Sequence, residues 1–469
     1  MVEPPGDRVA VFDLDGVLVD LPIARERVRA RIEQIAADLG VGGSFRPLLA
    51  SLERAQQTLA GRDPEAAQAL RDRAWAVIDD EERIAAERAV ARPGAARLLE
   101  LLSRPGARVP MALYTNNHIS AARRALAVAG LSPDRFFAVE ARRGPASLKP
   151  AGEPLVRIAQ AAPSPPARLF FVGDHPYDVE AAVRAQTLLG TDTTVVPLAL
   201  RSDRVADADL DRPGVGLLID RLSDAYAFIT AAPAPCSVAV VLLAYDEEDA
   251  IADAIADARR FLSLYARGHQ IVVVDDGSRD RTAARADACA NDCDGSDLVL
   301  VRHPKNQGMG ASMRDGYRAA TADYLAHLPA DRQVRPAALI RFWPYLDPAR
   351  PRRVILSSYE RAPSGPARLL MSAGFRILVR YLGGYRVDFA GTYLFHRGLL
   401  DRVDPARTPS SSFLYSFQLL EAMRRRGAEF VRVRISPFAR EFGTSREATA
   451  RRIGRLAVEV ARARLATRG

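Results

Sequence analysis

The sequence predicts an α/β protein with two units, each built around a parallel sheet flanked by helices. Short apolar runs alternate with helical patterns along most of the chain, which is typical of strands buried in a parallel sheet. The alternation stops at a stretch rich in Ala and Pro near residue 231 and then begins again. At 469 residues, the chain also exceeds the usual size of a single hydrophobic core.

The first half, residues 1–230, is expected to form one domain with an inserted cap. Its predicted buried strands are Val9–Phe12, Val109–Tyr114, Arg168–Val172 and Thr194–Leu198, and its clearest helices are Ile119–Ala129 and Val179–Gln186. Between the first two strands, residues from about 21 to 92 are rich in Ala, Arg, Glu and Leu at helical spacing. This insert predicts a helical cap.

The second half, residues 237–469, repeats the alternation after a linker predicted at residues 231–236. Its predicted strands are Ser237–Ala244, Gln270–Val274, Leu298–Val301 and Tyr324–Leu328. Its predicted helices are Glu247–Leu264, Arg281–Ala290 and Met309–Ala320. The two halves therefore predict two cores of the same general class.

Composition and charge indicate a globular cytoplasmic protein. Hydrophobic residues make up 48% of the chain and charged residues 26%, with a formal net charge of +9. Basic and aromatic residues form no common stripe, so no nucleic-acid partner is expected, while attraction to anionic lipids or phosphorylated substrates stays open. The odd number of cysteines, three, favours a reduced protein. Neither an apolar leader nor an 18-residue apolar run is found, so no membrane span is expected.

Two carboxylates follow the first predicted strand. Asp13 and Asp15 are two residues apart on extended backbone, so both side chains can face one site. One carboxylate can attack phosphorus as a nucleophile and form an aspartyl-phosphate. The other can protonate the leaving oxygen and later activate water.

Three later segments supply further groups for phosphoryl chemistry. Thr115 follows the second strand, and its hydroxyl can hold a phosphoryl oxygen. Lys149 can neutralise the charge of a phosphate, and Asp174 and Asp178 offer the oxygen ligands that Mg²⁺ prefers. The neighbouring polar residues that can contact substrate are Asn116, Asn117 and His118. For Asn117, a helix-capping role is the alternative.

This ordered set resembles the haloacid dehalogenase superfamily over residues 7–230. The resemblance implies a Rossmann-like hydrolase domain with a helical cap, as in phosphoglycolate phosphatase and β-phosphoglucomutase. It implies that Asp13 is the nucleophile, Asp15 the general acid/base, and Thr115 and Lys149 phosphate-binding residues. The implied Mg²⁺ ligands are Asp13, the Asp15 carbonyl and Asp174, with support from Asp178. A phosphatase and a phosphomutase stay indistinguishable, because both use Asp13 and Asp15 alike.

Polar residues also follow the predicted strands of the second half. Tyr245 and Glu247 follow the first of these strands, and Asp275 and Asp276 follow the second. Strand-end carboxylates can accept hydrogen bonds from a nucleobase and from ribose hydroxyls. The segment Asn306-Gln-Gly-Met-Gly310 opens a helix, whose N-terminus favours a phosphate and whose glycines allow close backbone approach.

These segments resemble family 2 glycosyltransferases, especially the dolichol-phosphate-mannose synthase-like subgroup, over residues 236–446. The resemblance implies a nucleotide-binding α/β domain of GT-A type, a nucleotide-sugar donor, and Mg²⁺ or Mn²⁺. The implied donor-binding residues are Tyr245, Glu247, Asp275, Asp276, Asn306, Gly308 and Asp331. Val387-Asp-Phe-Ala-Gly-Thr392 and Arg440-Glu-Phe-Gly-Thr-Ser445 resemble acceptor-side segments. They imply Asp388 as a catalytic base, and Arg440 and Ser445 as acceptor or phosphate contacts.

The metal motif departs from the Asp-x-Asp-x-Gln pattern of the family. The chain has Pro329-Ala-Asp-Arg-Gln333, so Asp331 and Gln333 remain as metal ligands while Pro329 has no ligating side chain. Gln418 stands where the subgroup often has Glu, which leaves Asp388 as the base candidate. A hydroxyl acceptor needs such a base, whereas a phosphate acceptor does not. Either weakened metal binding or a lost transferase activity is compatible with the motif.

Three functions are compatible with the sequence. The leading hypothesis is a bifunctional enzyme that transfers a sugar to an acceptor and dephosphorylates a related metabolite. The second is a polyprenyl-phosphate glycosyltransferase with an accessory phosphatase at the inner membrane face. In that case the amphipathic segment Pro366–Gly383 lies on the membrane surface rather than packing on the sheet. The third is a hydrolase with a non-catalytic sugar-nucleotide-binding module, which the Pro329 substitution favours.

Overall fold

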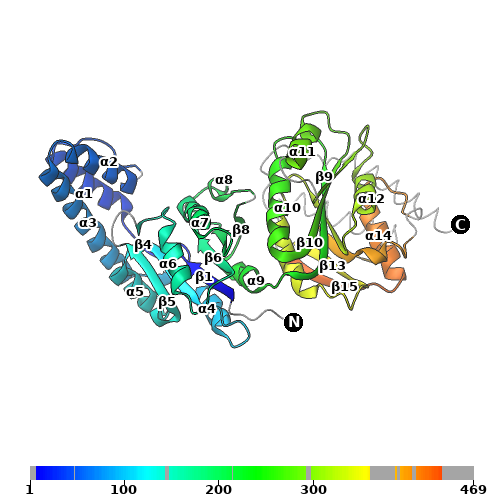
Figure 1. Cartoon of the computed structure of the whole chain (residues 1–469), viewed down its shortest axis with the longest axis horizontal. Helices are drawn as coiled ribbons and strands as arrows, with labels where there is room; N and C mark the ends of the chain where they lie inside the picture. Colours follow the sequence, from blue (N-terminus) through cyan, green and yellow to red (C-terminus); the bar gives the residue numbers. More distant parts are fainter. Residues whose placement is uncertain are drawn as a thin grey trace. The chain divides into compact units, whose positions relative to one another are not determined.

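The computed structural model describes residues 7–46, 48–142, 147–213, 215–291, 297–359, 386–387, 391–403 and 408–435. It has two compact units (Figure 1), the first formed by residues 1–212 and 216–230, the second by residues 213–215 and 231–469. The segment Pro366–Gly383, expected to be an amphipathic helix, lies outside the described residues.

The first unit contains a six-stranded sheet in the order β5-β4-β1-β6-β7-β8, in which all neighbouring strands are parallel. The strands are β1 Arg8–Phe12, β4 Met111–His118, β5 Phe136–Arg142, β6 Arg168–Gly173, β7 Thr194–Leu200 and β8 Leu217–Ile219. The helices are α4 Ala95–Ser103, α5 Ile119–Val128, α6 Glu153–Ala161, α7 Pro176–Leu189, α8 Asp207–Leu210 and α9 Ala225–Thr230. Every residue of β1 is buried, which confirms the prediction of a buried strand.

The cap is helical, as predicted, and has a core of its own. Its helices are α1 Arg25–Asp38, α2 Leu48–Ala60 and α3 Pro64–Ala86. The short antiparallel strands β2 Val19–Asp20 and β3 Val90–Ala91 form its base. Apolar side chains such as Ile32, Leu52 and Leu70 pack together inside the cap. Helix α3 begins after Asp63, whose carboxylate accepts hydrogen bonds from the first free backbone N–H groups.

The second unit contains a seven-stranded sheet in the order β11-β10-β9-β12-β14-β13-β15. The strands are β9 Ala234–Ala244, β10 Ala266–Asp275, β11 Leu298–Arg302, β12 Tyr324–Pro329, β13 Arg353–Tyr359, β14 Tyr393–His396 and β15 Glu429–Ile435. The helices are α10 Ile251–Tyr265, α11 Thr282–Asn291, α12 Met309–Ala319 and α14 Leu414–Arg425. Strands β11, β10, β9 and β12 are parallel, as the sequence predicts, while β14 runs antiparallel to both of its neighbours.

Short 3-10 helices complete the described elements: Pro133–Arg135, Leu222–Asp224, Pro336–Tyr345 and Arg397–Leu399. Strand β9 begins at Ala234, inside the stretch expected to be a linker. Helix α10 begins at Ile251 rather than at Glu247, because Asp246 takes a φ of +52° and the chain turns there first. Among the described residues, no helix combines the length and the apolar character that crossing a membrane requires.

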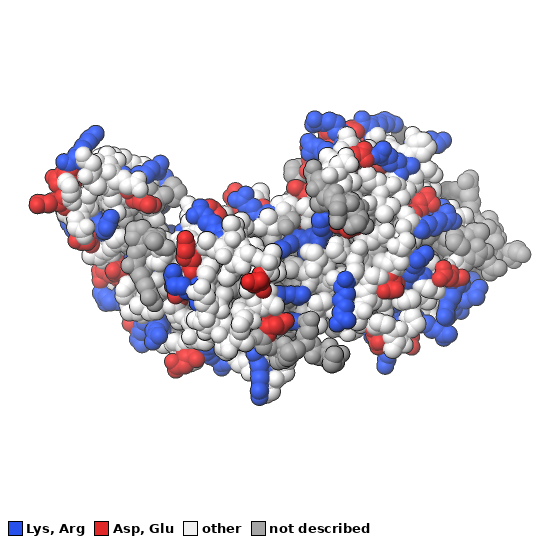
Figure 2. Space-filling view, viewed as in Figure 1, with Lys and Arg blue, Asp and Glu red and all other residues white. Residues whose placement is uncertain are grey.

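Basic and acidic side chains are interspersed over the face drawn in Figure 2. Many of them pair across neighbouring helical turns. Glu100, for example, lies 2.8 Å from Arg97 and 2.7 Å from Arg104. Such exposed pairs each contribute little to stability.

A buried histidine in the second core makes stability depend on pH. His327 on β12 lies within hydrogen-bond distance of the Tyr317 hydroxyl, at 2.8 Å, and burial lowers the pKa of His327 to about 3. The unfolded chain, with an ordinary histidine pKa near 6.5, therefore binds the proton more tightly than the folded chain. Stability that is present above pH 6.5 is lost as the pH falls toward 3.

We expect the second unit to lose on the order of 3 kcal/mol of unfolding free energy between pH 7 and pH 4 through His327 alone. Urea unfolding of the full chain at both pH values measures the loss, and His327→Gln should remove this component of it. An equal loss in the wild-type chain and in the His327→Gln variant would contradict the assignment.

Candidate active sites

The carboxyl ends of β4, β1 and β6 meet at one edge of the first sheet, because these three strands are neighbours (Figure 1). Thr115 lies near the end of β4, Asp13 directly follows β1, and Asp174 directly follows β6. Lys149 comes from the loop before α6, and Asp178 from the first turn of α7. All five side chains are buried, so the structure brings these predicted residues together.

Lys149 is the cation at the centre of this site. Its Nζ lies 2.5 Å from an Asp13 carboxylate oxygen and 2.7 Å from an Asp178 carboxylate oxygen. Burial by itself lowers the pKa of Lys149, but Asp13 and Asp178 outweigh burial and raise the pKa above its ordinary value. Lys149 therefore stays charged at neutral pH.

The carboxylates at this site fit a divalent cation. Oxygens of Asp13, Asp174 and Asp178 all lie within 4.8 Å of one another. Burial, reinforced by the other two carboxylates and opposed by Lys149, raises the pKa of Asp13 to about 8. Burial and then Asp178 raise the pKa of Asp174 to about 6. One lysine does not balance three buried carboxylates, and Mg²⁺ would supply the missing charge.

A glycine gives Asp174 its place beside Asp13. Gly16 has a φ of +87°, and a β-carbon there would overlap the Asp174 carboxylate. The glycine of the Asp-Leu-Asp-Gly segment is therefore required both by its backbone conformation and by the close approach of a site residue.

Asp15 lies at the exposed side of the site, toward the base of the cap. Its Oδ1 accepts a hydrogen bond from the Leu21 N–H at 2.9 Å. Its Oδ2 lies 2.9 Å from Nη2 of Arg25, on cap helix α1, and 3.0 Å from Nη1 of Arg204, in the loop after β7. Sequence reasoning missed both arginines, because nothing distinguishes them in an arginine-rich chain.

The segment after Thr115 is organised by its own polar residues. The Thr115 hydroxyl donates to Oδ1 of Asn117 at 3.0 Å, and Oδ1 of Asn116 accepts from the Lys149 N–H at 2.8 Å. The cap of helix α5 is His118, whose ring accepts a hydrogen bond from the Ser120 N–H. Asn117 therefore supports Thr115 and does not cap the helix.

A buried ion pair that the sequence did not reveal joins the cap to this segment. Arg142, at the end of β5, lies 2.7 Å from Glu82 on cap helix α3, and its Nε donates to the Asn116 carbonyl at 3.0 Å. Glu82 also accepts a hydrogen bond from the His118 N–H at 2.8 Å. Burial raises the pKa of Glu82, although Arg142 opposes the shift. These contacts fix α3 against the loop that carries Thr115 and Asn116.

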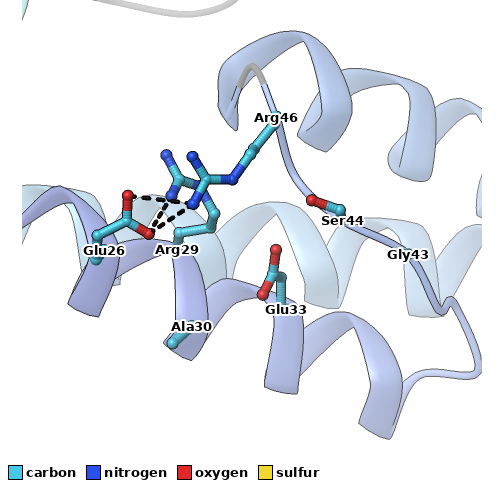
Figure 3. A pocket seen from close by; sticks show the side chains of 7 residues that line it. All are labelled: Glu26, Arg29, Ala30, Glu33, Gly43, Ser44 and Arg46. Atoms are coloured by element: carbon cyan, nitrogen blue, oxygen red, sulfur yellow. Dashed lines mark hydrogen bonds and ion pairs between the residues drawn. The ribbon is translucent and has the colours of Figure 1, made fainter.

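The cap has a separate polar hollow of about 370 Å³ between α1 and the loop before α2 (Figure 3). It is lined by Glu26, Arg29, Ala30, Glu33, Gly43, Ser44 and Arg46. The charged groups in it pair with one another: Glu26 contacts Arg29 and lies 3.0 Å from Arg46. With Glu33, the charged lining residues are two carboxylates and two guanidiniums, so their charges sum to zero.

In the second unit, β10, β9 and β12 are neighbouring parallel strands, so their carboxyl ends share one edge. Asp276 directly follows β10, Tyr245 directly follows β9, and Asp331 lies two residues after β12. With β9 between β10 and β12, Asp276 and Asp331 lie about two strand spacings apart, roughly 10 Å. Tyr245 and Glu247 are partly exposed there, and Asn306 is exposed.

The two aspartates at the carboxyl end of β10 bind loops of the chain itself. Asp276 accepts hydrogen bonds from the N–H groups of Gln307 and Gly308, both at 2.8 Å, and contacts the His303 ring at 2.7 Å. Asp275 accepts from the Ser278 N–H at 3.0 Å. Both oxygens of Asp276 are thus already engaged without a ligand.

The start of helix α12, expected to face a phosphate, is covered by the chain. The Gly310 N–H donates to the Ser411 carbonyl at 2.8 Å. A β-carbon on Gly308, with a φ of +96°, would overlap the same carbonyl. The glycines do permit close backbone approach, as the sequence predicts, but the approaching backbone is residues 410–412. Gln418 holds the same segment by accepting the Ser410 N–H at 3.1 Å.

The loop that carries the predicted metal motif, residues 329–333, has a strained backbone and is held by ion pairs of a buried arginine. Arg332 has a φ of +59°, and its buried guanidinium lies 3.0 Å from Asp257 and 3.3 Å from Asp253, both on α10. Asp331 accepts the Gln333 N–H at 3.0 Å. Asp246, after β9, is also a non-glycine residue with positive φ. Such strain clusters at functional sites, and it marks this edge of the sheet. The expected acceptor-side residues Asp388, Arg440 and Ser445 lie outside the described residues.

Comparisons with known proteins match a different family in each half of the chain. Residues 8–186 match the model of the haloacid dehalogenase-like hydrolase family, and residues 239–400 match the model of glycosyl transferase family 2. The N-terminal part of the chain is therefore similar to haloacid dehalogenase-like hydrolases, and the C-terminal part to family 2 glycosyltransferases. These matches confirm the two resemblances.

The curated relatives match only part of the chain. The undecaprenyl-phosphate 4-deoxy-4-formamido-L-arabinose transferase of Pseudomonas aeruginosa (strain LESB58) is 35% identical over 104 residues, which is 22% of this chain and 30% of that protein. Its counterpart in Yersinia pestis (strain Pestoides F) is 28% identical over 22% of this chain and 32% of that protein. The chain thus spans about a third of the length of these relatives.

Two solved structures are each similar to about half of this chain. A hydrolase from Pseudomonas syringae is 20% identical over 46% of this chain and 94% of its own, with a TM-score of 0.34. Glucosyl-3-phosphoglycerate synthase from Mycobacterium tuberculosis is 20% identical over 50% of this chain and 80% of its own, with a TM-score of 0.37.

Proposed function

We propose that the first unit is a Mg²⁺-dependent phosphatase that acts on a small phosphate ester through an aspartyl-phosphate. The observation that carries the proposal is the buried cluster in which Lys149 pairs with both Asp13 and Asp178 beside Asp174. This arrangement holds a carboxylate nucleophile at a cation-binding position, where a phosphate dianion can be neutralised.

In the proposed reaction, an Asp13 oxygen attacks phosphorus, and the bond between phosphorus and the ester oxygen breaks. Asp15 gives its proton to the leaving oxygen, so an alcohol departs and Asp13 carries the phosphoryl group. Asp15 then takes a proton from water, whose oxygen attacks phosphorus and releases phosphate and Asp13. Lys149, Thr115 and Asn116 hold the phosphoryl oxygens. Asp13, Asp174 and the Asp15 carbonyl, with support from Asp178, would hold Mg²⁺, which would supply positive charge at the phosphate.

We infer that the second unit transfers a sugar from a nucleotide-sugar at the edge formed by β10, β9 and β12. The donor residues proposed there are Tyr245, Glu247, Asp275, Asp276, Asn306, Gly308 and Asp331. Asp331 and Gln333 would hold Mg²⁺ or Mn²⁺, and Asp388 would be the base. The strained, buried Arg332 supports the inference, because it fixes the backbone between the two metal ligands.

The identity of the sugar acceptor determines where in the cell the protein would act. A phosphorylated, water-soluble acceptor would be glycosylated by the second unit and dephosphorylated by the first, in the cytoplasm. A polyprenyl phosphate, the kind of acceptor named in the curated relatives, would place the chain at the inner membrane face, with Arg440 and Ser445 on the acceptor side. Full retention of the chain in the supernatant with anionic vesicles present would count against the second possibility.

A second candidate is a sugar-nucleotide-binding module without turnover. Two observations favour it: Pro329 replaces the first metal-motif aspartate, and Asp276 is already bound to the chain's own N–H groups. Calorimetric titration with nucleotide-sugars, followed by transfer assays on many acceptors, separates the two. Binding without transfer supports the module.

Removal of divalent metal tests the phosphatase proposal. We expect a chelator to abolish phosphate release from sugar phosphates and added Mg²⁺ to restore it. We also expect Mg²⁺ to raise the melting temperature of the first unit, because the ion binds the folded state alone. Phosphate release that persists at full rate in excess chelator would contradict a metal-dependent mechanism.

A further inference from the structure

Two arginines stand at the side of the phosphatase site that a leaving group would occupy. Arg25 and Arg204 come from distant parts of the chain and both contact Oδ2 of Asp15, at 2.9 and 3.0 Å. Asp15 is already held through its other oxygen by the Leu21 N–H at 2.9 Å. Two cations on one carboxylate exceed what its orientation alone requires.

The two arginines are open to a ligand. The Arg25 side chain is 57% exposed and the Arg204 side chain 31%, whereas Lys149 is 4% exposed. Each guanidinium has five N–H donors. Asp15 accepts from Nη2 of Arg25, and Arg204 divides its Nη groups between Asp15 and Asp20, the latter at 3.3 Å.

The position of Asp15 determines what these arginines would meet. A general acid must lie within hydrogen-bond distance of the leaving oxygen. The atoms of the substrate next to that oxygen therefore come within reach of Arg25 and Arg204. Guanidinium groups pair with carboxylate and phosphate groups through parallel hydrogen bonds, and each of these two arginines has more N–H donors than its contacts with Asp15 and Asp20 use.

We propose that Arg25 and Arg204 recognise a second negatively charged group, a carboxylate or a second phosphate, on the leaving group of the substrate. This inference rests on the proposed phosphatase function and narrows it to phosphate esters of anionic alcohols. In this proposal, Lys149 and Mg²⁺ bind the transferred phosphoryl group, and the two arginines bind the leaving group of the substrate. Cap helix α1 thereby contributes to substrate selection.

Two matched substrate pairs test the proposal with the full chain and Mg²⁺. 3-Phosphoglycerate and glycerol 3-phosphate differ by a carboxylate, and ribose 1,5-bisphosphate and ribose 5-phosphate differ by a phosphate. We expect kcat/KM to favour the more anionic ester in at least one pair, and that pair identifies the group. Arg25→Gln or Arg204→Gln should lower kcat/KM for this ester by about 10- to 100-fold, with a change under about threefold for its partner.

Arg27→Gln is the control, because Arg27 lies on the same helix with a side chain 61% exposed and pairs with Glu81 away from Asp15. Equal kcat/KM values within both pairs, or an equal loss on both esters in Arg25→Gln and Arg204→Gln, would overturn the proposal. An equal loss would mean that the arginines only position Asp15.

Binding to Asp13→Asn separates this inference from the proposed function. Calorimetric titration of that variant with each ester measures recognition without hydrolysis. Equal dissociation constants within both pairs overturn the inference even if the wild-type chain releases phosphate. Selective binding of the anionic ester supports the inference even if the hydrolysis follows another route.

Discussion

Asp13→Asn is expected to lower phosphate release by about 10⁴-fold or more, the size of loss seen when a nucleophile is removed from an enzyme site. The amide does not attack phosphorus as a carboxylate does, so the proposed aspartyl-phosphate at this position beside Lys149 does not form. Steady-state phosphate release by the full chain measures the loss. Sugar transfer by the second unit should not change.

The stability of the same variant distinguishes lost chemistry from lost structure. Because burial and two neighbouring carboxylates raise the pKa of Asp13 to about 8, its charged form is disfavoured in the folded state. The neutral amide removes that penalty, so without metal the melting temperature at pH 8 should be no lower than that of the wild type. Asp134→Asn, at an exposed position of the same unit, is the matched control. Phosphate release near the wild-type rate in Asp13→Asn would refute the nucleophile.

Gly308→Ala is expected to destabilise the second unit by about 3 kcal/mol or more. A β-carbon at Gly308 has two costs. The backbone, with φ +96° and ψ +157°, lies in a region that essentially only glycine adopts, which costs an alanine about 1–3 kcal/mol. Overlap with the Ser411 carbonyl adds about 1–3 kcal/mol as overpacking. Residues 410–412 would have to move away from helix α12. Calorimetric unfolding of the full chain measures the loss.

Gly427→Ala is the control that carries a backbone penalty without an overlap. Gly427 also has a positive φ, +80°, but the nearest atom to its β-carbon position is 3.8 Å away on the Arg352 side chain. We expect about 1 kcal/mol of destabilisation there. If both variants lose the same amount, the segment 410–412 does not pack on Gly308, and the glycines remain available for a phosphate.

Local sequence patterns were sufficient to predict which carboxylates lie at the sheet edge of the first site. Asp13 and Asp174 follow strands that are apolar after a first arginine, and such strands are recognisable without knowledge of the fold. The order of motifs also predicted that Lys149 belongs to the same site, and the structure places Lys149 beside Asp13. The cap was also predictable, because its helices repeat apolar residues at helical spacing.

Residues that act through long-range contacts were not predictable. Arg204 and Asp20 are 184 residues apart, and Arg142 and Glu82 are 60 apart, so only the docked cap brings each pair together. Strands β13 and β15 were missed as well. In β15, exposed and partly exposed residues outnumber buried ones, so the strand lacks the continuous apolar run that predicted the central strands.

The second site shows how a motif can be recognised while its contacts are misjudged. The glycines at 308 and 310 were expected to approach a phosphate, and the structure uses them to approach residues 410–412 instead. A pattern of glycines predicts that another group approaches the backbone closely, but it does not identify that group. The partner segment lies about a hundred residues further along the chain.

The buried contact between Arg142 and Glu82 limits how this protein can be re-engineered. A chimaera that exchanges the whole insert at β2 and β3 for the cap of a relative would leave the Arg142 guanidinium desolvated without its counter-ion, at a cost of about 3–5 kcal/mol. A graft that ends before residue 79 would retain both carboxylates that neutralise this arginine. The interchangeable part of the insert is therefore α1, α2 and the first half of α3.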